Sequence, residues 1–392
     1  MLNKLLYSLL LIISCTTLFS QSCGYQSSYY PRLSSQEASR NTRMLYVAVV
    51  VHLIESEDGS TFISNQQVLD QISALNRDFN QQNHEWRGLP NAIKNTAGKA
   101  NITFYLAQQT PSGEPTNGIT RTTNAWENMS TADVFHTSRG GHDAWPTDQY
   151  LNIWVADLPQ RLLGFASSPL DAGSFSDGVV LNKRVFGLAS GPFSMGRSLV
   201  HEVGHYLGLL HPWGHRAEEC QEDDGVQDTP PQYAAHFGCP PRELMGCETA
   251  RPSYWNFMDY TPDCCMALFT HGQIRIMRDV LQQARHTLVS YGEEHYQALG
   301  SLFTEAQIVI YPNPAMHYVS IDWSAQSEHS SQSYELLQVY DQYGRVVINI
   351  PLSPGRDRTE LCVHQLPAGS YSLFLLGEGQ ERHHAGRLVR AR

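Results

Sequence analysis

The first part of the chain alternates between strand-like and helix-like patterns of hydrophobic residues. Residues 43–54, RMLYVAVVVHLI, form a dense β-branched run that predicts a buried strand. Residues 65–79 place apolar side chains at helical spacing and predict an amphipathic helix. Later runs continue the alternation, with strands predicted over 101–107, 150–158 and 178–182 and a helix over 272–285. Strands interleaved with helices indicate an α/β domain, which we place at residues 44–290.

The pattern changes after about Tyr291. Residues 306–392 consist of short alternating segments separated by Asn, Pro and Gly turns, and they contain no helical periodicity. This texture predicts an all-β sandwich, of immunoglobulin-like type, and its length is ordinary for one such domain. Residues 291–305 are expected to link the two domains.

The N-terminus has the layout of an export signal. One lysine precedes an apolar run, and small and polar residues follow, so residues 1–20 predict a signal peptide cleaved after Ser20. A lipoprotein box ending at Cys15 is the alternative interpretation. Residues 21–43 are polar and lack periodicity, which is typical of a pro-segment. No later stretch is apolar enough to predict a transmembrane segment.

Composition narrows the classes of protein further. At 392 residues the chain is too long for one core and fits two or three domains. The net charge of -11 argues against nucleic acid or an anionic membrane as partner, because either needs a basic face. Eight cysteines in an exported chain indicate disulfide bonds.

The stretch HEVGHYLGLLH, residues 201–211, predicts a metal site. His201 and His205 are four residues apart, so both imidazoles lie on one face of a helix and can reach one Zn²⁺ at about 2.0–2.1 Å. Glu202 lies beside them and is placed to act on metal-bound water. Gly208 suits a left-handed helix end, after which the chain can bring His211 back as a third ligand.

The alternative interpretation is a histidine-rich helix that binds no metal. Chance alone would produce the five specified residues on the order of once in 10⁴ sequences of this length, so we favour the zinc site. His215 falls outside the pattern and is assigned to a solvated loop.

The histidine pattern is the extended zinc signature of the metzincin metallopeptidases, which continues downstream in a Met-turn. NFMDY, residues 256–260, supplies Met258 for that turn and Tyr260 two residues later. A buried methionine below a zinc site packs as a soft hydrophobic side chain and is not a ligand.

Within the metzincins the chain resembles the pappalysin family, especially its short bacterial members of the ulilysin type. The matching stretches are HEVGHYLGLLH, DDGVQDTP at 223–230, GCP at 238–240 and NFMDYTPDCCMALFTHGQ at 256–273. The close match covers about residues 198–285. The resemblance implies a metzincin catalytic domain, with a mixed sheet, a backing helix and an active-site helix. It also implies zinc on the three histidines, and thus a secreted endopeptidase acting on proteins or peptides.

Two catalytic roles accompany that resemblance. Glu202 is implied as the general base, which takes a proton as water attacks the peptide carbonyl and then delivers it to the leaving amine. Tyr260 is implied near the metal, where its hydroxyl stabilises the developing oxyanion. A binding protein on an inactive peptidase scaffold is the rival interpretation, but such a protein would usually have lost a ligand or the glutamate.

Asp263 follows the Met-turn, where such peptidases form the pocket for the residue after the scissile bond. Ulilysin-like members carry an aspartate there and prefer Arg or Lys at this position, P1′. A carboxylate at the floor of a pocket favours a cationic side chain by charge complementarity. The alternative is an acid in a surface loop.

The acidic stretch after the third histidine is a candidate calcium site. Asp223, Asp224, Asp228 and the Thr229 carbonyl can supply oxygen ligands, and ulilysin-like enzymes bind Ca²⁺ in this region. Gln227 stands where an acid is expected, and an acidic loop without an ion remains the alternative.

Five cysteines fall between Cys220 and Cys265, and any four can pair in three ways. The family resemblance implies the pairs Cys220–Cys247 and Cys239–Cys265, which leaves Cys264 over. A cysteine zinc site is a competing interpretation.

Cys23 in the pro-segment is followed by glycine. A thiolate there can occupy the open zinc position and keep the enzyme latent, as cysteine-switch propeptides do. Self-cleavage before Arg40 or Arg43 would suit the Asp263 pocket.

The C-terminal segments YPNPA, VYDQYGRVV, LPAGSYSLFL and GRLVRAR resemble the sorting domain of the type IX secretion system of Bacteroidetes. The resemblance implies passage through the outer membrane by that machinery, followed by release or surface attachment. A generic β-sandwich, such as one that binds carbohydrate, is the alternative.

Overall fold

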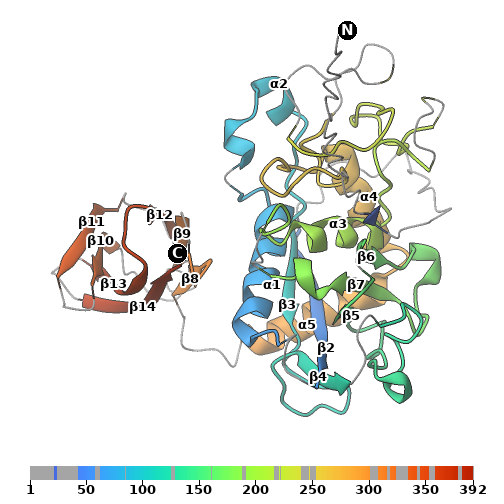
Figure 1. Cartoon of the computed structure of the whole chain (residues 1–392), viewed down its shortest axis with the longest axis horizontal. Helices are drawn as coiled ribbons and strands as arrows, with labels where there is room; N and C mark the ends of the chain where they lie inside the picture. The colour runs from blue at the N-terminus through green and yellow to red at the C-terminus, as the bar shows by residue number, and fades with distance from the viewer. Residues whose placement is uncertain are drawn as a thin grey trace, which may run out of the picture.

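The computed structural model shows two units, an N-terminal α/β unit and a C-terminal pair of β-sheets (Figure 1). The described residues are 22–23, 43–57, 62–83, 85–124, 129–159, 161–187, 191–215, 220, 222–239, 247, 253–300, 308–315, 318–323, 334–341, 345–352, 358–377 and 382–391. The expected signal peptide and lipoprotein box, and the Arg40 cleavage site, lie outside these residues, as does residue 240 of the GCP motif. None of the described helices is long and apolar enough to cross a membrane.

The N-terminal unit is built on a seven-stranded mixed sheet in the order β1-β6-β7-β5-β2-β3, with β4 also paired to β2. The bounds are β1 Ser22–Cys23, β2 Leu45–Ser56, β3 Ile102–Leu106, β4 Ile119–Asn124, β5 Leu151–Ala156, β6 Leu162–Ala166 and β7 Gly178–Asn182. β6 is antiparallel to β7, whereas β5 and β7 are parallel. Three of these strands, β1, β4 and β6, were not predicted, because none of them is a long apolar run.

Helices cover both faces of this sheet (Figure 1). The helices are α1 Asn65–Phe79, α2 Asn91–Lys94, α3 Arg197–Tyr206, α4 His271–Gln282 and α5 His286–Gly300, with short 3-10 turns at Glu85–Gly88, Thr137–Arg139, Pro169–Asp171 and Lys183–Val185. Side chains alternate along a strand, so Val47 and Val49 of β2 pack toward α1 and α3, whereas Ala48 and Val50 face a cluster that includes Tyr291 of α5. This two-sided burial explains the unbroken apolar run predicted as a strand.

Helix α5 differs from the sequence prediction. Residues 291–300 were assigned to a linker, but they continue α5 as far as Gly300. The helix packs closely on β2. A Cβ atom added at Gly292 would lie only 2.2 Å from the carbonyl oxygen of Tyr46, so the close approach requires glycine at this position. The hydroxyls of Tyr150 and Tyr291 also share a hydrogen bond of 2.7 Å. Packing against β2 therefore stabilises the helical conformation of residues 291–300, which the weak apolar pattern of this segment did not predict.

The C-terminal unit contains a four-stranded sheet, β11-β10-β13-β14, and a three-stranded sheet, β12-β9-β8. The bounds are β8 Val309–Tyr311, β9 Tyr318–Asp322, β10 Tyr334–Tyr340, β11 Val346–Pro351, β12 Arg358–Cys362, β13 Gly369–Gly377 and β14 Arg382–Arg390. All the strand pairs within these two sheets are antiparallel. Trp323, Leu337 and Leu373 belong to one shared apolar core, so the sheets form the expected β-sandwich.

Candidate active site

Helix α3 and the turn after it bring three imidazoles together. His201 and His205 lie one turn apart on the buried helix, and their Nε2 atoms are 3.1 Å apart. The Nε2 atom of His211 lies 3.1 Å from that of His205 and 3.3 Å from that of His201. All three predicted ligands therefore point at one place, whereas His215 is exposed and not part of this cluster.

The three nitrogens fit a tetrahedral metal ion. Ligand nitrogens about 2.0–2.1 Å from zinc would lie about 3.3–3.4 Å from each other, close to the observed spacing. The Nδ1 atom of His201 is 2.8 Å from the Phe257 carbonyl, and that of His205 is 2.8 Å from the Leu209 carbonyl. Nδ1–H donation to a carbonyl leaves the Nε2 lone pair free for a metal. Burial also lowers the pKa of His201 to about 4, which keeps the ring neutral.

A left-handed glycine makes the third imidazole possible. Gly208 has φ 89° and follows the C-cap residue of α3, Leu207, so the chain leaves the helix in a tight turn, as predicted. His211 then stacks on Trp213, with ring centroids 4.5 Å apart and planes 6° from parallel. The indole fixes the orientation of the imidazole, a role that the sequence analysis did not assign to Trp213.

Glu202 lies at the edge of the three-histidine cluster. Its side chain is 2% exposed, and burial raises its pKa to about 8. A Cβ at Gly164 of β6 would lie 3.1 Å from Oε1 of Glu202, so a larger residue at position 164 would crowd the carboxylate. A buried carboxyl whose pKa lies near neutrality is suited to both accepting and giving a proton.

The predicted Met-turn lies directly below the histidines. Met258 is fully buried, and a Cβ at Gly204 of α3 would lie 2.5 Å from its sulfur. Tyr260 places its ring 5.7 Å from that of His201 and 5.0 Å from that of His211. The turn therefore supports the helix from below and presents Tyr260 beside the metal-binding atoms.

Asp259 connects this turn to the segment that carries Phe237 and Gly238. Its carboxylate accepts hydrogen bonds from the backbone N–H groups of His236 and Tyr260, at 2.9 and 2.7 Å. It is also 2.7 Å from Nδ1 of His236 and accepts from the Gln232 amide at 3.0 Å. Asp259 is fully buried, and the sequence analysis missed it because an Asp beside a Tyr carries no signal of its own.

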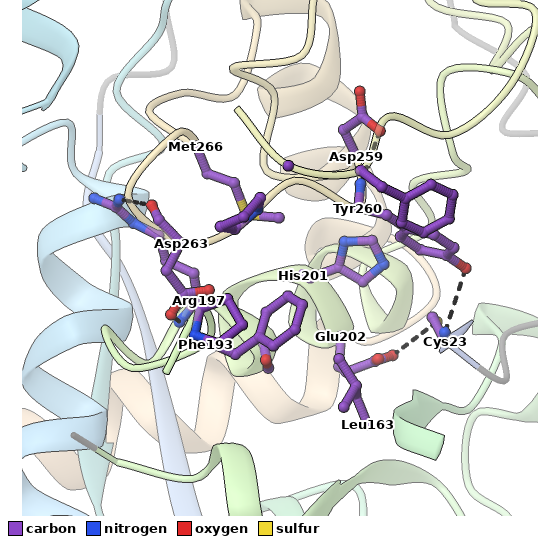
Figure 2. Close-up of a pocket in the computed structure, with 15 residues that line it drawn as sticks. Cys23, Leu163, Phe193, Arg197, His201, Glu202, Asp259, Tyr260, Asp263 and Met266 are labelled. Carbon is purple, nitrogen blue, oxygen red and sulfur yellow. Dashed lines mark hydrogen bonds between the residues drawn. The ribbon is translucent and has the colours of Figure 1, made fainter. Parts of the chain in front are cut away.

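Cys23 reaches the site from strand β1. β1 pairs in parallel with β6, which places Cys23 opposite Gly164. The Cys23 sulfur lies within 4.8 Å of the ligand atoms of His201, His205 and His211. It also donates to Glu202 at 3.3 Å, and the Cys23 backbone N–H donates to the Tyr260 hydroxyl at 3.3 Å, as Figure 2 shows.

A pocket of about 360 Å³ extends from Cys23 past His201 to Asp263 (Figure 2). Asp263 is 1% exposed, and its Oδ2 atom accepts the backbone N–H groups of Met195 and Arg197 at 2.7 and 3.2 Å. Its Oδ1 atom has no hydrogen-bond partner among the residues that the structure describes. Burial raises the pKa of Asp263 to about 6. The predicted pocket acid is therefore a buried group with one oxygen left for a ligand.

Arg197 supports the floor of this pocket. Its guanidinium is completely buried and forms ion pairs with Asp78 and Glu85, and it also donates to the carbonyl oxygen of Asp263. The charge of Arg197 is thus balanced by α1 and the turn after it, and no described residue forms a direct ion pair with the Asp263 carboxylate. The sequence analysis missed Arg197 because its ion-pair partners, Asp78 and Glu85, lie more than 100 residues away.

The acidic loop after His211 contains buried oxygens without partners. Oδ2 of Asp224 and Oδ1 of Asp228 are buried and make no hydrogen bond to any described residue. Burial, together with the charges of Asp223 and Asp228, raises the pKa of Asp224 well above its usual range. Thr229 is buried beside them, whereas Gln227 is exposed. Burying carboxylate oxygens without hydrogen-bond partners costs free energy. Oxygen atoms of this kind are the ligands that a hard cation prefers.

Two disulfides lie in the region between the histidine helix and the Met-turn. They are Cys220–Cys247 and Cys239–Cys265, with Cα atoms 5.6 and 5.7 Å apart. These are the pairs that the family resemblance implies. Cys264 remains a thiol, as do Cys23 and Cys362.

Two family models match the chain in separate regions. Residues 136–282 match peptidase family M43, described as pregnancy-associated plasma protein-A. Residues 309–385 match the secretion system C-terminal sorting domain. The first match contains the three histidines, Glu202 and Tyr260, and the second covers most of the β-sandwich.

Curated relatives and solved structures agree with these matches. An extracellular metalloprotease of Arthroderma otae is 31% identical over 221 residues, which are 49% of this chain and 74% of the relative. That of Arthroderma gypseum is 34% identical over 151 residues, and the chain spans only 50% of its length. Mature mirolysin of Tannerella forsythia, solved with a cleaved peptide, is 39% identical, with 64% of this chain and 97% of that chain covered and a TM-score of 0.61. The chain therefore belongs to the pappalysin family, peptidase family M43, and is a secreted metalloendopeptidase with a C-terminal type IX sorting domain.

Proposed function

We propose that this metalloendopeptidase uses zinc, held by His201, His205 and His211. The observation that carries the proposal is the convergence of three Nε2 atoms within 3.1–3.3 Å of each other. When bound there, zinc would supply a Lewis acid that polarises the scissile carbonyl and makes water more acidic.

The side chains around the metal-binding atoms divide the remaining work of peptide hydrolysis. Glu202 takes a proton from the attacking water, and it passes the proton to the leaving amine. Burial raises the pKa of Glu202 to about 8, so near neutral pH both the carboxylate and the carboxylic acid are accessible for these two transfers. The Tyr260 hydroxyl donates a hydrogen bond to the oxyanion as it develops.

Metal analysis and peptide cleavage on the same preparations test this proposal. The mature protein should hold one zinc per chain, and His205→Ala should lose it because a tetrahedral site needs three protein ligands. Glu202→Gln should keep the zinc but cleave peptides about 10²–10⁴-fold more slowly. His286→Ala, at an exposed position on α5, is the control for loss of a histidine. Full activity in Glu202→Gln would exclude this mechanism.

We propose that Asp263 gives the enzyme a preference for Arg or Lys at P1′. Asp263 lines the pocket next to the histidines, and its buried Oδ1 atom lacks a partner among the described residues, so we infer that this atom accepts a hydrogen bond from a cationic side chain. Arg197 is already paired with Asp78 and Glu85, which leaves the Asp263 charge available. A peptide library varied at P1′ should show this preference, and equal cleavage of neutral residues would contradict it.

We propose that the chain is made as a latent precursor with Cys23 as its switch. The thiol lies among the metal-binding nitrogens and hydrogen-bonds to Glu202, so it occupies the place of the attacking water. One similar structure is that of a promirolysin mutant, 38% identical to this chain, and its name denotes a precursor. We place the pro-segment at residues 21–43, after a signal peptide at 1–20, with self-cleavage before Arg40 or Arg43.

The latency proposal is tested with the precursor protein. Cys23→Ser should process itself and cleave peptides without the lag of the wild type, because a serine hydroxyl is a far weaker zinc ligand than a thiolate. Cys362→Ser, in the sorting domain, is the matched control for removal of a cysteine outside the disulfides. An unchanged lag in Cys23→Ser would refute the switch.

We also propose a calcium ion at Asp224, Asp228 and Thr229, supported by the partnerless carboxylate oxygens in the described part of that loop. The ion would neutralise carboxylates that burial alone makes unfavourable. For the C-terminal unit, we propose that residues 306–392 form an immunoglobulin-like sandwich, supported by two antiparallel sheets over one core.

A further inference from the structure

Three cysteine sulfurs gather beside the substrate pocket. Cys239 and Cys265 form a disulfide, and the sulfur of Cys264 lies 3.6 Å from that of Cys239 and 3.8 Å from that of Cys265. Cys264 and Cys239 are exposed, whereas Cys265 is 8% exposed. A free thiol is therefore almost in van der Waals contact with both sulfurs of a disulfide.

The backbone explains this grouping. The Cys265 N–H donates to the Pro262 carbonyl at 2.8 Å, which closes a turn over residues 262–265. The Asp263 N–H donates to the Pro192 carbonyl at 2.8 Å and attaches the turn to the neighbouring loop. Consecutive residues usually point in different directions along an extended chain, but within a turn their side chains can face the same partner. Cys264 and Cys265 thus both reach Cys239.

We propose that Cys264 is the nucleophile of an internal thiol–disulfide exchange that converts the Cys239–Cys265 link into a Cys239–Cys264 link. The Cys264 thiolate attacks the Cys239 sulfur, the new sulfur–sulfur bond forms, and the Cys265 sulfur leaves as a thiolate. The proton lost by Cys264 is recovered by Cys265. The number of disulfides and thiols is unchanged, so the reaction needs no oxidant or reductant.

A soft-metal site on the same three sulfurs is the competing use of this cluster. Three thiolates would bind such a metal well, but the disulfide would first have to be reduced by two electrons. Neither the structure nor peptide hydrolysis supplies that reductant. The exchange needs no added reagent, only a rotation of the exposed Cys264 side chain into line with the Cys239–Cys265 bond, so the observations favour it.

The exchange alters the link between two walls of the pocket. Two segments that line the pocket carry these cysteines: Phe237 and Gly238 precede Cys239, and Pro262, Asp263 and Met266 surround Cys265 in the chain. Asp259 holds the other end of the first wall by hydrogen bonds to His236. Moving the link by one residue therefore shifts Gly238 against Asp263 while the Asp259 anchor stays in place. We infer that the two disulfide isomers differ in their handling of P1′ residues.

The two linkages are distinguished by the position of the remaining thiol. The full-length protein is incubated at pH 8 without added thiol, trapped with N-ethylmaleimide at pH 6, and digested. Fragmentation of the peptide between positions 264 and 265 shows which sulfur carries the label. We expect the label on Cys265 to grow with time to a plateau, and to grow more slowly at pH 6, because the thiolate is the attacking species. A label confined to Cys264 at all times would overturn the proposal.

Two variants fix the isomers for comparison. Cys264→Ser retains the Cys239–Cys265 link, and Cys265→Ser leaves Cys239 and Cys264 as the remaining pair of the cluster. Cys265→Ser should form the Cys239–Cys264 disulfide. This variant also shows that the peptide mapping detects that disulfide. For a peptide with Arg at P1′, kcat/KM should differ between the two variants by about tenfold, because small displacements of a binding wall are costly. Equal values would overturn the inferred effect on the pocket, while the wild-type mapping stands independently as the test of the exchange.

Discussion

Replacing Asp263 by Asn tests whether this carboxylate is kept for substrate binding at a cost to stability. Burial raises its pKa from the ordinary 3.8 to about 6 in the folded protein. The folded state therefore binds a proton more tightly than the unfolded state, and stability falls as the pH rises from about 4 to above 6. A shift of this size corresponds to about 3 kcal/mol in total, of which about 1 kcal/mol falls between pH 5 and pH 8.

The amide introduced by Asp263→Asn does not titrate, so the stability difference between the variant and the wild type should depend on pH. The asparagine oxygen can still accept the N–H groups of Met195 and Arg197, which keeps the local hydrogen bonds. Urea unfolding of both proteins at pH 5 and pH 8 should show the variant gaining about 1 kcal/mol relative to the wild type at the higher pH. Asp148→Asn, at an exposed position, should show no such gain.

The same substitution should remove the preference for a cation at P1′. Peptides that carry Arg or the neutral isostere citrulline at P1′ isolate the charge, because the two side chains have nearly the same shape. A charge-assisted hydrogen bond contributes about 1.5–3 kcal/mol, so the ratio of kcat/KM for Arg over citrulline should fall about 10–100-fold in Asp263→Asn. An unchanged ratio, or a stability difference that is flat with pH, would refute the assignment of Asp263 as a charged pocket floor.

Three further changes address the helix, the turn below it and the acidic loop. Gly204→Ala should lower the free energy of unfolding by about 1–3 kcal/mol, although alanine has the better helix propensity, because the new methyl would lie too close to the Met258 sulfur. Thermal unfolding measures this loss, and a Met258→Ala background should tolerate the change. Removing calcium with EGTA should lower the unfolding temperature, since an ion present at about 100 times its Kd contributes about 2.7 kcal/mol of stability. Asp228→Asn should abolish that response, and an EGTA effect of equal size in this variant would count against the site. Asp259→Asn should reduce kcat while zinc is retained, because the substitution weakens the hydrogen bond that holds the Tyr260 backbone. A loss of zinc instead would contradict the role of Asp259 in positioning Tyr260.

Local spacing made the metal centre predictable from the sequence. The interval between His201 and His205 determines that both rings lie on one helix face, and Gly208 supplies the φ of 89° that lets His211 return. These relations all lie within residues 201–211, so no knowledge of the rest of the fold is needed. The helix at 65–79 and the strand at 178–182 were predicted with their observed bounds for the same reason.

Relations between distant segments were decided only by the tertiary structure. The Arg197 guanidinium pairs with Asp78, the Asp259 carboxylate accepts from Gln232, and Cys264 lies 3.6 Å from Cys239. Each contact joins residues at least 25 positions apart, and no periodic pattern encodes such a distance. The same holds for the Asp263 pKa, which depends on burial by α3 and the neighbouring loops.

The sequence by itself thus determined the chemistry of the centre, because ligand type and helical spacing are local properties of the chain. The tertiary structure decided the surroundings of that chemistry. It brings the Cys23 sulfur next to the ring nitrogens of the three histidines, and it leaves one oxygen of Asp263 without a hydrogen-bond partner among the described residues. Packing of segments far apart in sequence creates both arrangements, and packing free energy belongs to the whole fold, not to any one stretch of residues.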